Sequence, residues 1–189
     1  MGRLRHFGQM SSLLQRQGPI NLVTNGNFVD ANGWTVAGGT LLVVSNKATI
    51  TGSGTTRYPQ IYQSVSGNTG NKIYVRAKLL VTNSVAQAIS IAASGAAIVF
   101  QANPTQGVVY TLSGIRTMVG VSAENFSIFA TYPDNATAGG KTLEVQEVFA
   151  ANLTVIFGAG NEPTVAQCNQ LFPVWFDGIK PSSLSKFLS

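Results

Sequence analysis

The side chains that could carry out acid–base or nucleophilic chemistry are few in this chain. It has one histidine, His6, one cysteine, Cys168, and seven acids: Asp30, Glu124, Asp134, Glu144, Glu147, Glu162 and Asp177. A glycosidase needs only two carboxylates, so the count alone does not exclude one. Glu144 and Glu147 are three residues apart, however, and on a regular strand they point to opposite faces. The sequence therefore predicts a protein that is not an enzyme.

Metal and phosphate sites are not predicted either. A single cysteine permits neither an internal disulfide nor a cysteine-based metal cage, and we expect Cys168 to be a small core residue. Asp30, Asp134 and Glu147 could hold a structural calcium ion, but no acid-rich loop gathers them, so solvated loop acids are favoured. The glycine-rich stretches 52–54 and 158–160 lack the Gly-Lys-Ser/Thr ending of a phosphate loop and are predicted to be turns. No cofactor is expected.

A binding site is a stronger candidate than a catalytic one. Tyr58, Gln60 and Tyr62 alternate along the chain, so an extended backbone places them on one face. Two flat rings beside an amide offer a stacking surface for a sugar. The alternative is structural: the tyrosines cap the rim of the fold or fill a subunit interface.

The composition predicts a body with a nearly neutral surface. Only 10% of the residues are charged, against about 25% in ordinary soluble domains. The net charge of +5 comes largely from the first nineteen residues, which hold Arg3, Arg5 and Arg16 and no acid. The remaining charges do not form a patch that could follow nucleic-acid phosphates. Because no apolar run approaches 18 residues, a membrane-spanning helix is also excluded.

Residues 1–19 are predicted to be a docking arm. Apolar residues recur there at helical spacing, and Gly18-Pro19 ends the pattern. A helix so short is not stable alone, so we expect it to order on a partner. A frayed basic terminus and a mitochondrial transit peptide are the alternatives. The arm residues are Leu4, Phe7, Met10 and Leu14, with Arg3, Arg5 and Arg16.

From residue 20 the chain is a succession of short β-like runs separated by Gly, Asn, Pro and Ser. This spacing is typical of a β-sandwich or jelly roll. The predicted strands cover residues 20–24, 34–36, 40–45, 47–51, 60–65, 72–82, 88–93, 97–101, 108–112, 117–121, 126–132 and 142–150. In residues 72–81 the apolar side chains of Ile73, Val75, Ala77, Leu79 and Val81 fall on one face, which is expected to be buried, and Tyr74, Arg76 and Lys78 fall on the other, which is expected to be wet.

One helix is predicted in the body, within residues 163–172. Thr164 and Gln167 have the spacing of a capping box, and Pro173 stops the helix. Glu162 lies near its N-terminus, where unpaired amides favour a carboxylate, so a stabilising role is expected. Ile156 and Phe157 are interpreted as apolar anchors of a strand, which residues 161–164 end as they begin the helix. Trp175 and Phe176 are expected to pack the tail onto the body or onto a neighbouring subunit.

Two segments carry a resemblance to known proteins. The run NLVTNGNF at residues 21–28, followed by Gly33-Trp34, YPQIYQ at 58–63 and KIY at 72–74, resembles the opening half of carbohydrate-binding-module jelly rolls. The run NLTVIFGAGNEPT at 152–164, with the later WFDG at 175–178, resembles a segment of tailed-bacteriophage structural proteins. Many such modules have Phe-Glu at the end of the first motif, and that acid helps to hold calcium. Here Phe28 is followed by Val29-Asp30, so the resemblance does not carry the ion over.

Together these resemblances imply a phage virion protein, a tail appendage or a capsid decoration or head fibre, on the exterior of the particle. Its organisation would be a docking arm (1–19), a jelly-roll domain (20–152) and a C-terminal segment (153–189) that packs on the body. The expected partners are other virion proteins, further copies of the chain with a trimer favoured, and host surface glycans, without nucleic acid or membrane insertion. The alternative is a free carbohydrate-binding module or a glycan-active enzyme.

Overall fold

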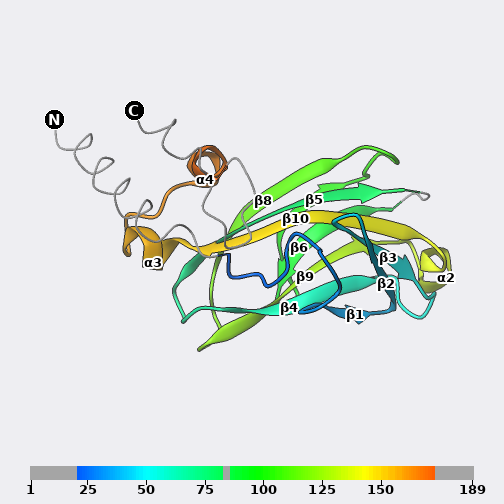
Figure 1. The fold of residues 1–189 in the computed structure, drawn as a ribbon, viewed down its shortest axis with the longest axis horizontal. Coiled ribbons are helices and arrows are strands. Elements are labelled where there is room, and N and C mark those ends of the chain that lie inside the picture. The colour runs from blue at the N-terminus through cyan, green and yellow to red at the C-terminus, as the bar shows by residue number, and fades with distance from the viewer. Residues whose placement is uncertain (1–20, 83–85, 173–189) are drawn as a thin grey trace.

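The computed structural model describes residues 21–82 and 86–172, which form a sandwich of two antiparallel sheets (Figure 1). Sheet A has the strand order β1-β4-β9-β6-β7, and sheet B has the order β2-β3-β10-β5-β8. The strands of sheet A are β1 (Thr35–Ala37), β4 (Gln60–Ser66), β6 (Ala88–Ala93), β7 (Ala96–Ala102) and β9 (Ala123–Thr131). Those of sheet B are β2 (Gly39–Val44), β3 (Lys47–Gly52), β5 (Lys72–Val81), β8 (Tyr110–Thr117) and β10 (Thr142–Asn152). The predicted all-β sandwich is confirmed.

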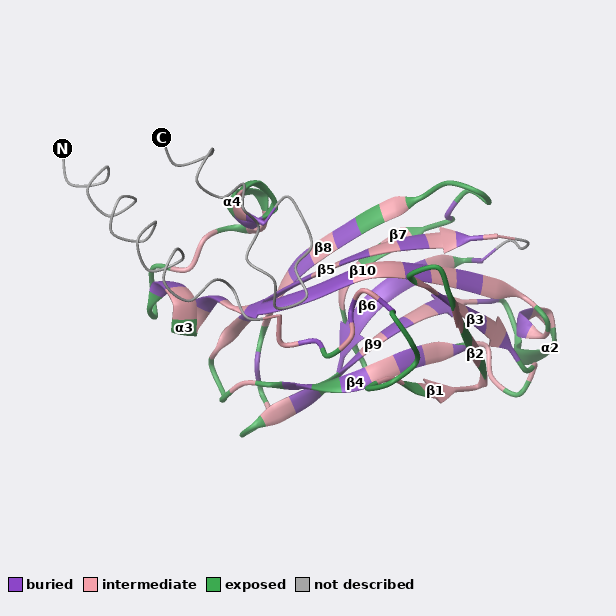
Figure 2. Ribbon diagram, in the orientation of Figure 1, coloured by how far each residue is buried: buried purple, intermediate pink, exposed green. Residues whose placement is uncertain are grey.

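The core lies between the sheets because the strands alternate in hydrophobicity. In β5 the predicted inner face is confirmed: every second side chain from Ile73 to Val81 is buried. The strands β4 and β9 show the same alternation, which Figure 2 displays as bands of buried residues along the ribbons. A strand in which every second residue is apolar presents one apolar face. When two sheets of such strands pack face to face, both apolar faces are removed from water.

The predicted strands 108–112 and 117–121 differ from the structure. One strand, β8, runs from Tyr110 to Thr117 through Gly114, and residues 118–121 are not in a strand. A Cβ atom on Gly114 would lie 2.8 Å from the Cγ2 atom of Ile98 in β7. Glycine therefore allows the edges of the two sheets to approach each other here, which is a packing role rather than a break.

The predicted strand over residues 20–24 is absent from its described part, residues 21–24. This segment instead lies beside β10 where β3 no longer pairs with it. The side chain of Asn21 bonds to β10 as a neighbouring strand would. Its side-chain amide donates to the carbonyl of Val148, and its Oδ1 accepts from the backbone amide of Ala150. Gly26 and Val148 then meet backbone to backbone, so closely that a Cβ on Gly26 would lie 2.1 Å from the Val148 oxygen.

The C-terminal segment forms a second, smaller core on the outer face of sheet B. The helices α3 (Leu153–Phe157) and α4 (Val165–Leu171) lie at one end of the sandwich, and α2 (Asn135–Ala138) lies at the other (Figure 1). The capping box of Thr164 and Gln167 is confirmed at the start of α4. The strand expected at Ile156 and Phe157 is wrong, because the side chain of Asn152 accepts from the amide of Val155 and caps α3, which contains both residues. Tyr74, expected on a wet face of β5, is instead fully buried beside Phe149 and Phe172.

No helix within the described part of the chain is long and apolar enough to cross a membrane.

Candidate functional site

The residues predicted to bind a ligand lie on the outer face of sheet A. In β4 the side chains of Ile61, Gln63 and Val65 are buried between the sheets. The strand alternates, so Gln60 and Tyr62 point to the opposite, outer side, where both are half-buried. Tyr58 precedes the strand by two residues and is 38% exposed.

A phenylalanine of the neighbouring strand completes this part of the face. Phe129 of β9 is directly opposite Gln60 in the strand register. Its ring lies edge-on to that of Tyr58, with centroids 6.0 Å apart and planes at 89°. The Cζ atom of Arg57 is 4.8 Å from the centre of the Tyr58 ring, within the range of a cation–π contact. These contacts hold Tyr58 in place.

The same row continues across the sheet to a more exposed ring. Ser90 of β6 lies opposite Phe129, and Phe100 of β7 lies opposite Ser90. Phe100 is 60% exposed. Because neighbouring strands are about 4.8 Å apart, the row from Gln60 to Phe100 spans about 14 Å. The row therefore carries two aromatic rings, Phe129 and Phe100, on strands two apart, and Tyr58 lies against the first of them.

Sequence reasoning missed Phe129 and Phe100. For Phe129 a signal was available, because Phe126, Ile128 and Ala130 alternate toward the core and leave residue 129 outside. For Phe100 the order of the strands is needed, since β7 reaches the row only through β6.

The strands of sheet A place no charged side chain on its outer face, and the guanidinium beside Tyr58 belongs to Arg57, which precedes β4. The five strands of this sheet contain one charged residue, Glu124, and its carboxylate is buried. It accepts hydrogen bonds from Arg116 Nε at 3.0 Å and from the amides of Val119 and Gly120. Burial alone would raise the pKa of Glu124, but these donors outweigh it and hold the pKa below its usual value.

Beside the rings, the polar groups of this face are neutral amides and hydroxyls. They come from Thr35, Gln60, Ser64, Asn125, Ser127 and Thr131. Flat apolar rings next to such groups can stack on the apolar face of a sugar and hydrogen bond to its hydroxyls. The outer face of sheet B has the opposite character, with ion pairs between Lys47 and Glu144 and between Lys78 and Glu147.

The pairing of Glu144 and Glu147 corrects the expectation that they point to opposite faces. Glu147 has a positive φ of 51°, and the register of β10 with β5 shifts between Gln146 and Phe149. A β-bulge inserts one residue and reverses the alternation beyond it. Both carboxylates consequently lie on the outer face of sheet B, each bound to a lysine, at 3.2 Å for Glu144 and 2.6 Å for Glu147.

Glu162 was expected to stabilise the N-terminus of α4, but its carboxylate lies elsewhere. Its carboxylate turns toward α3 and β5, where it accepts from Gly160, from the hydroxyl of Thr154 and from Lys72 Nζ at 3.2 Å. Backbone and hydroxyl donors, together with this lysine, lower the pKa of Glu162 to about 2. The group is a structural anion inside the C-terminal segment.

The acids considered for calcium do not form a site. Asp134 caps α2 by accepting from the amide of Thr137 at 2.7 Å. Both carboxylate oxygens of Asp30 accept from amide groups of Asn25 and Asn32. Within residues 21–82 and 86–172 no three His, Cys, Asp or Glu side chains come together as a metal site would require. Asp30, Asp134 and Glu147 instead accept hydrogen bonds or an ion pair within their own surroundings.

Cys168 is fully buried in the second core, as predicted. Burial raises the pKa of its thiol to about 12, so the reactive thiolate is disfavoured.

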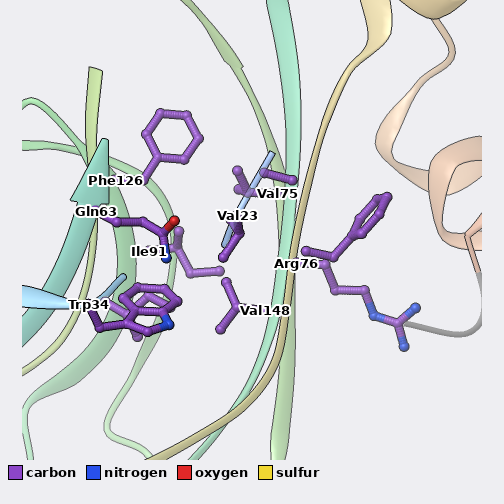
Figure 3. Close-up of a pocket in the computed structure, with 11 residues that line it drawn as sticks. Val23, Trp34, Gln63, Val75, Arg76, Ile91, Phe126 and Val148 are labelled. Atoms are coloured by element: carbon purple, nitrogen blue, oxygen red, sulfur yellow. The ribbon is translucent and has the colours of Figure 1, made fainter. Parts of the chain in front are cut away.

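A small pocket between the sheets is a packing feature rather than a binding site (Figure 3). Val23, Ile91 and Val148 line it, and Gln63 reaches into it. The Gln63 amide is satisfied by the backbone of Thr24, with hydrogen bonds of 2.8 and 3.1 Å. The guanidinium of Arg76 points away and donates to the carbonyl of Phe172.

The arm lies outside the described residues, so its role stays a prediction, as does the division of the chain into three parts. The same holds for the predicted packing of Trp175 and Phe176. The arm residues concerned are Leu4, Phe7, Met10, Leu14, Arg3, Arg5 and Arg16.

No protein family model and no curated protein sequence matches the chain. Similar solved structures exist, each at low sequence identity. A family 4 carbohydrate-binding module gives a TM-score of 0.49 at 12% identity, over 65% of this chain and 96% of that one. An arabinose-bound α-L-arabinofuranosidase gives 0.52 at 12% identity, over 72% of this chain and 27% of that one. Tailspike protein 4 of bacteriophage CBA120 gives 0.48 at 14% identity, over 70% and 21%.

These likenesses concern the fold. The chain is an all-β sandwich of two antiparallel sheets, a fold that it shares with part of the arabinofuranosidase.

Proposed function

We propose that the outer face of sheet A binds uncharged glycans. The observation that carries this proposal is the cross-strand arrangement of Tyr58, Tyr62, Phe129 and Phe100 among neutral amides and hydroxyls. The strands of this face offer no cation to an anionic sugar, and the nearby Arg57 is already stacked on Tyr58, whereas a neutral sugar can use both stacking and hydrogen bonds. The resemblance of the fold to carbohydrate-binding modules supports the same reading.

Affinity for one copy is expected to be weak, because the face is open and the rings are few. Binding becomes strong when many copies act on one surface. The test is therefore a glycan array read with the protein displayed densely on beads, comparing neutral with sialylated or uronic-acid-containing oligosaccharides. The proposal is supported if the wild-type protein binds neutral glycans, the Phe100→Ala variant no longer binds them, and the Val121→Ala variant still does. Failure of dense beads to bind any glycan overturns it.

We also propose that the chain is a non-catalytic structural protein of a phage virion, attached to other virion proteins through residues 1–19. The resemblance of residues 152–164 to phage structural proteins supports this role. In the structure this segment buries Phe157 and the Glu162 carboxylate against sheet B, which suits a structural device. The attachment remains a prediction from the arm's apolar stripe and its basic charge.

Locating the protein on intact particles tests the virion role. Immunogold labelling on the exterior of the capsid or tail is expected, and deletion of residues 1–19 is expected to abolish incorporation while the body still folds. Wild-type incorporation of the truncated chain would mean that the body itself attaches. Absence from particles, combined with glycan binding, would instead indicate a free carbohydrate-binding module.

A glycan-active enzyme is the remaining alternative. Glu144 and Glu147 are each engaged by a lysine, so replacing either with Gln is expected to change stability only. Polysaccharide cleavage that disappears in Glu144→Gln or Glu147→Gln would show that the chain is an enzyme.

A further inference from the structure

The strand β2 is an open edge of sheet B. It pairs with β3 alone, through a hairpin whose two turn residues, Ser45 and Asn46, both have positive φ. In such a two-residue hairpin the residues that flank the turn, Val44 and Lys47, are a hydrogen-bonded pair. Alternation along the strand then turns the N–H and C=O groups of Leu41 and Val43 away from β3, toward the free edge. No other backbone group of the described residues is bonded to them.

This edge also exposes large apolar side chains. Leu42 is 63% exposed and Val44 is 57% exposed, both on the outer face of sheet B. Edge strands that must stay unpaired are usually protected by a lysine, a proline, a bulge or a covering loop. The sequence of β2, GTLLVV, has no charge and no proline, and its register with β3 is regular. The strand β2 thus has neither the charge, nor the proline, nor the bulge that would prevent strand pairing.

We propose that β2 pairs with β2 of a second copy of this chain, antiparallel and across a two-fold axis. An antiparallel edge is complementary to itself, since each outward N–H meets an outward C=O of the other strand. An uncharged strand brings no like charges together, and the nearest lysine, Lys47, is already bound to Glu144. The two B sheets would become one continuous sheet.

The outward groups determine the register. The two-fold axis then passes beside Leu42. Leu41 exchanges hydrogen bonds with Val43 of the second copy, and Val43 exchanges hydrogen bonds with Leu41 of the second copy. The two Leu42 residues then form the close, non-hydrogen-bonded pair, with Cα atoms about 4.5 Å apart. Val44 lies opposite Thr40 of the second copy.

Edge pairing of this kind is a weak contact. Two short strands bury less than the roughly 1,200 Å² of a stable interface, so association is expected at micromolar concentrations or higher. The contact joins two copies, in place of the three that the phage resemblance favours. It is independent of glycan binding, because sheet A takes no part in it.

Cross-linking in the full chain tests the register. Under mild oxidation Leu42→Cys is expected to form a disulfide-linked dimer, because the two Cα atoms face each other. Val44→Cys is the matched control, because its two copies are offset by four residues, about 14 Å, beyond the reach of a disulfide. Equal cross-linking of both variants, or none in Leu42→Cys, overturns the proposed pairing.

Sedimentation equilibrium tests the association without cross-links. The wild-type mass is expected to rise toward that of a dimer with concentration, and Leu42→Lys is expected to weaken association at least tenfold. Val121→Lys places the same charge on a valine that is 84% exposed and far along the chain, and should leave the association unchanged. Circular dichroism melts establish that both variants fold. A concentration-independent monomer mass, or a dimer insensitive to Leu42→Lys, contradicts the proposal.

Discussion

The ring of Tyr58 meets the edge of the Phe129 ring at 89° with their centroids 6.0 Å apart, and Arg57 lies against the same tyrosine. Tyr58 is therefore held before any ligand arrives. A ring held in this way loses little conformational freedom on binding, which increases the net affinity gained from stacking.

The first prediction concerns these rings. Replacing Tyr58 and Tyr62 together with Ala is expected to lower glycan affinity by about tenfold or more, since each stacking contact contributes roughly 0.5–1.5 kcal/mol. Isothermal titration against a neutral oligosaccharide measures the loss. Val121→Ala serves as the control on an unrelated exposed site. Binding that is unchanged in the double variant would remove both tyrosines from the site and leave their structural role.

The second prediction concerns acid stability. The pKa of Glu162 is lowered to about 2 from 4.5. A carboxyl whose folded pKa is depressed stabilises the fold fully above its unfolded pKa and loses that contribution as the pH falls toward the folded pKa. Glu162→Gln is therefore expected to unfold at lower urea concentration at pH 7, and the difference from wild type should shrink between pH 4.5 and pH 2.

Glu144→Gln is the control for the second prediction, because Glu144 has only its ion pair with the part-exposed Lys47, which contributes little. The role given to Glu162 would be contradicted if the difference in urea midpoint between the wild type and Glu162→Gln stayed constant across this pH range.

The third prediction compares two ion pairs of different burial. Arg116 pairs with Glu124, whose side chain is 1% exposed, whereas Lys47 pairs with the more exposed Glu144. Removing one partner leaves a buried carboxylate with fewer donors, so Arg116→Met is expected to cost about 2–4 kcal/mol. Lys47→Met is expected to cost less than about 1 kcal/mol. Chemical denaturation measures both, and similar costs would mean that the two backbone amides alone satisfy Glu124.

The fourth prediction concerns the contact between Gly26 and β10. A methyl group at residue 26 would lie 2.1 Å from the carbonyl oxygen of Val148, which is backbone and cannot move aside. Gly26→Ala is expected to destabilise the fold by about 2–4 kcal/mol. Gly67→Ala is the comparison, because a Cβ there meets only the flexible side chains of Ile73 and Met118 at 3.3 Å. Equal melting temperatures for the two variants would show that the segment before Asn27 can move off β10.

Local patterns were sufficient to predict much of this structure. The alternation in β5 and the capping box of α4 depend on neighbours along the chain, and both are confirmed. The prediction that Glu144 and Glu147 point to opposite faces was wrong, because a bulge is a property of two paired strands and not of one strand alone. Phe100 joins the candidate face only through the order β9-β6-β7, which depends on contacts distant in sequence.

The segment that begins at Asn21 binds to both sheets within a few residues. Asn21 is bonded to β10, and the backbone of Thr24 is bonded to Gln63 of β4, next to Tyr62. If the chain upstream is anchored while sheet A holds a ligand, tension meets the contact of Asn21 with β10 first and then passes through Thr24 into β4, the strand that bears Tyr62. The load is therefore divided between the two sheets where it enters the fold.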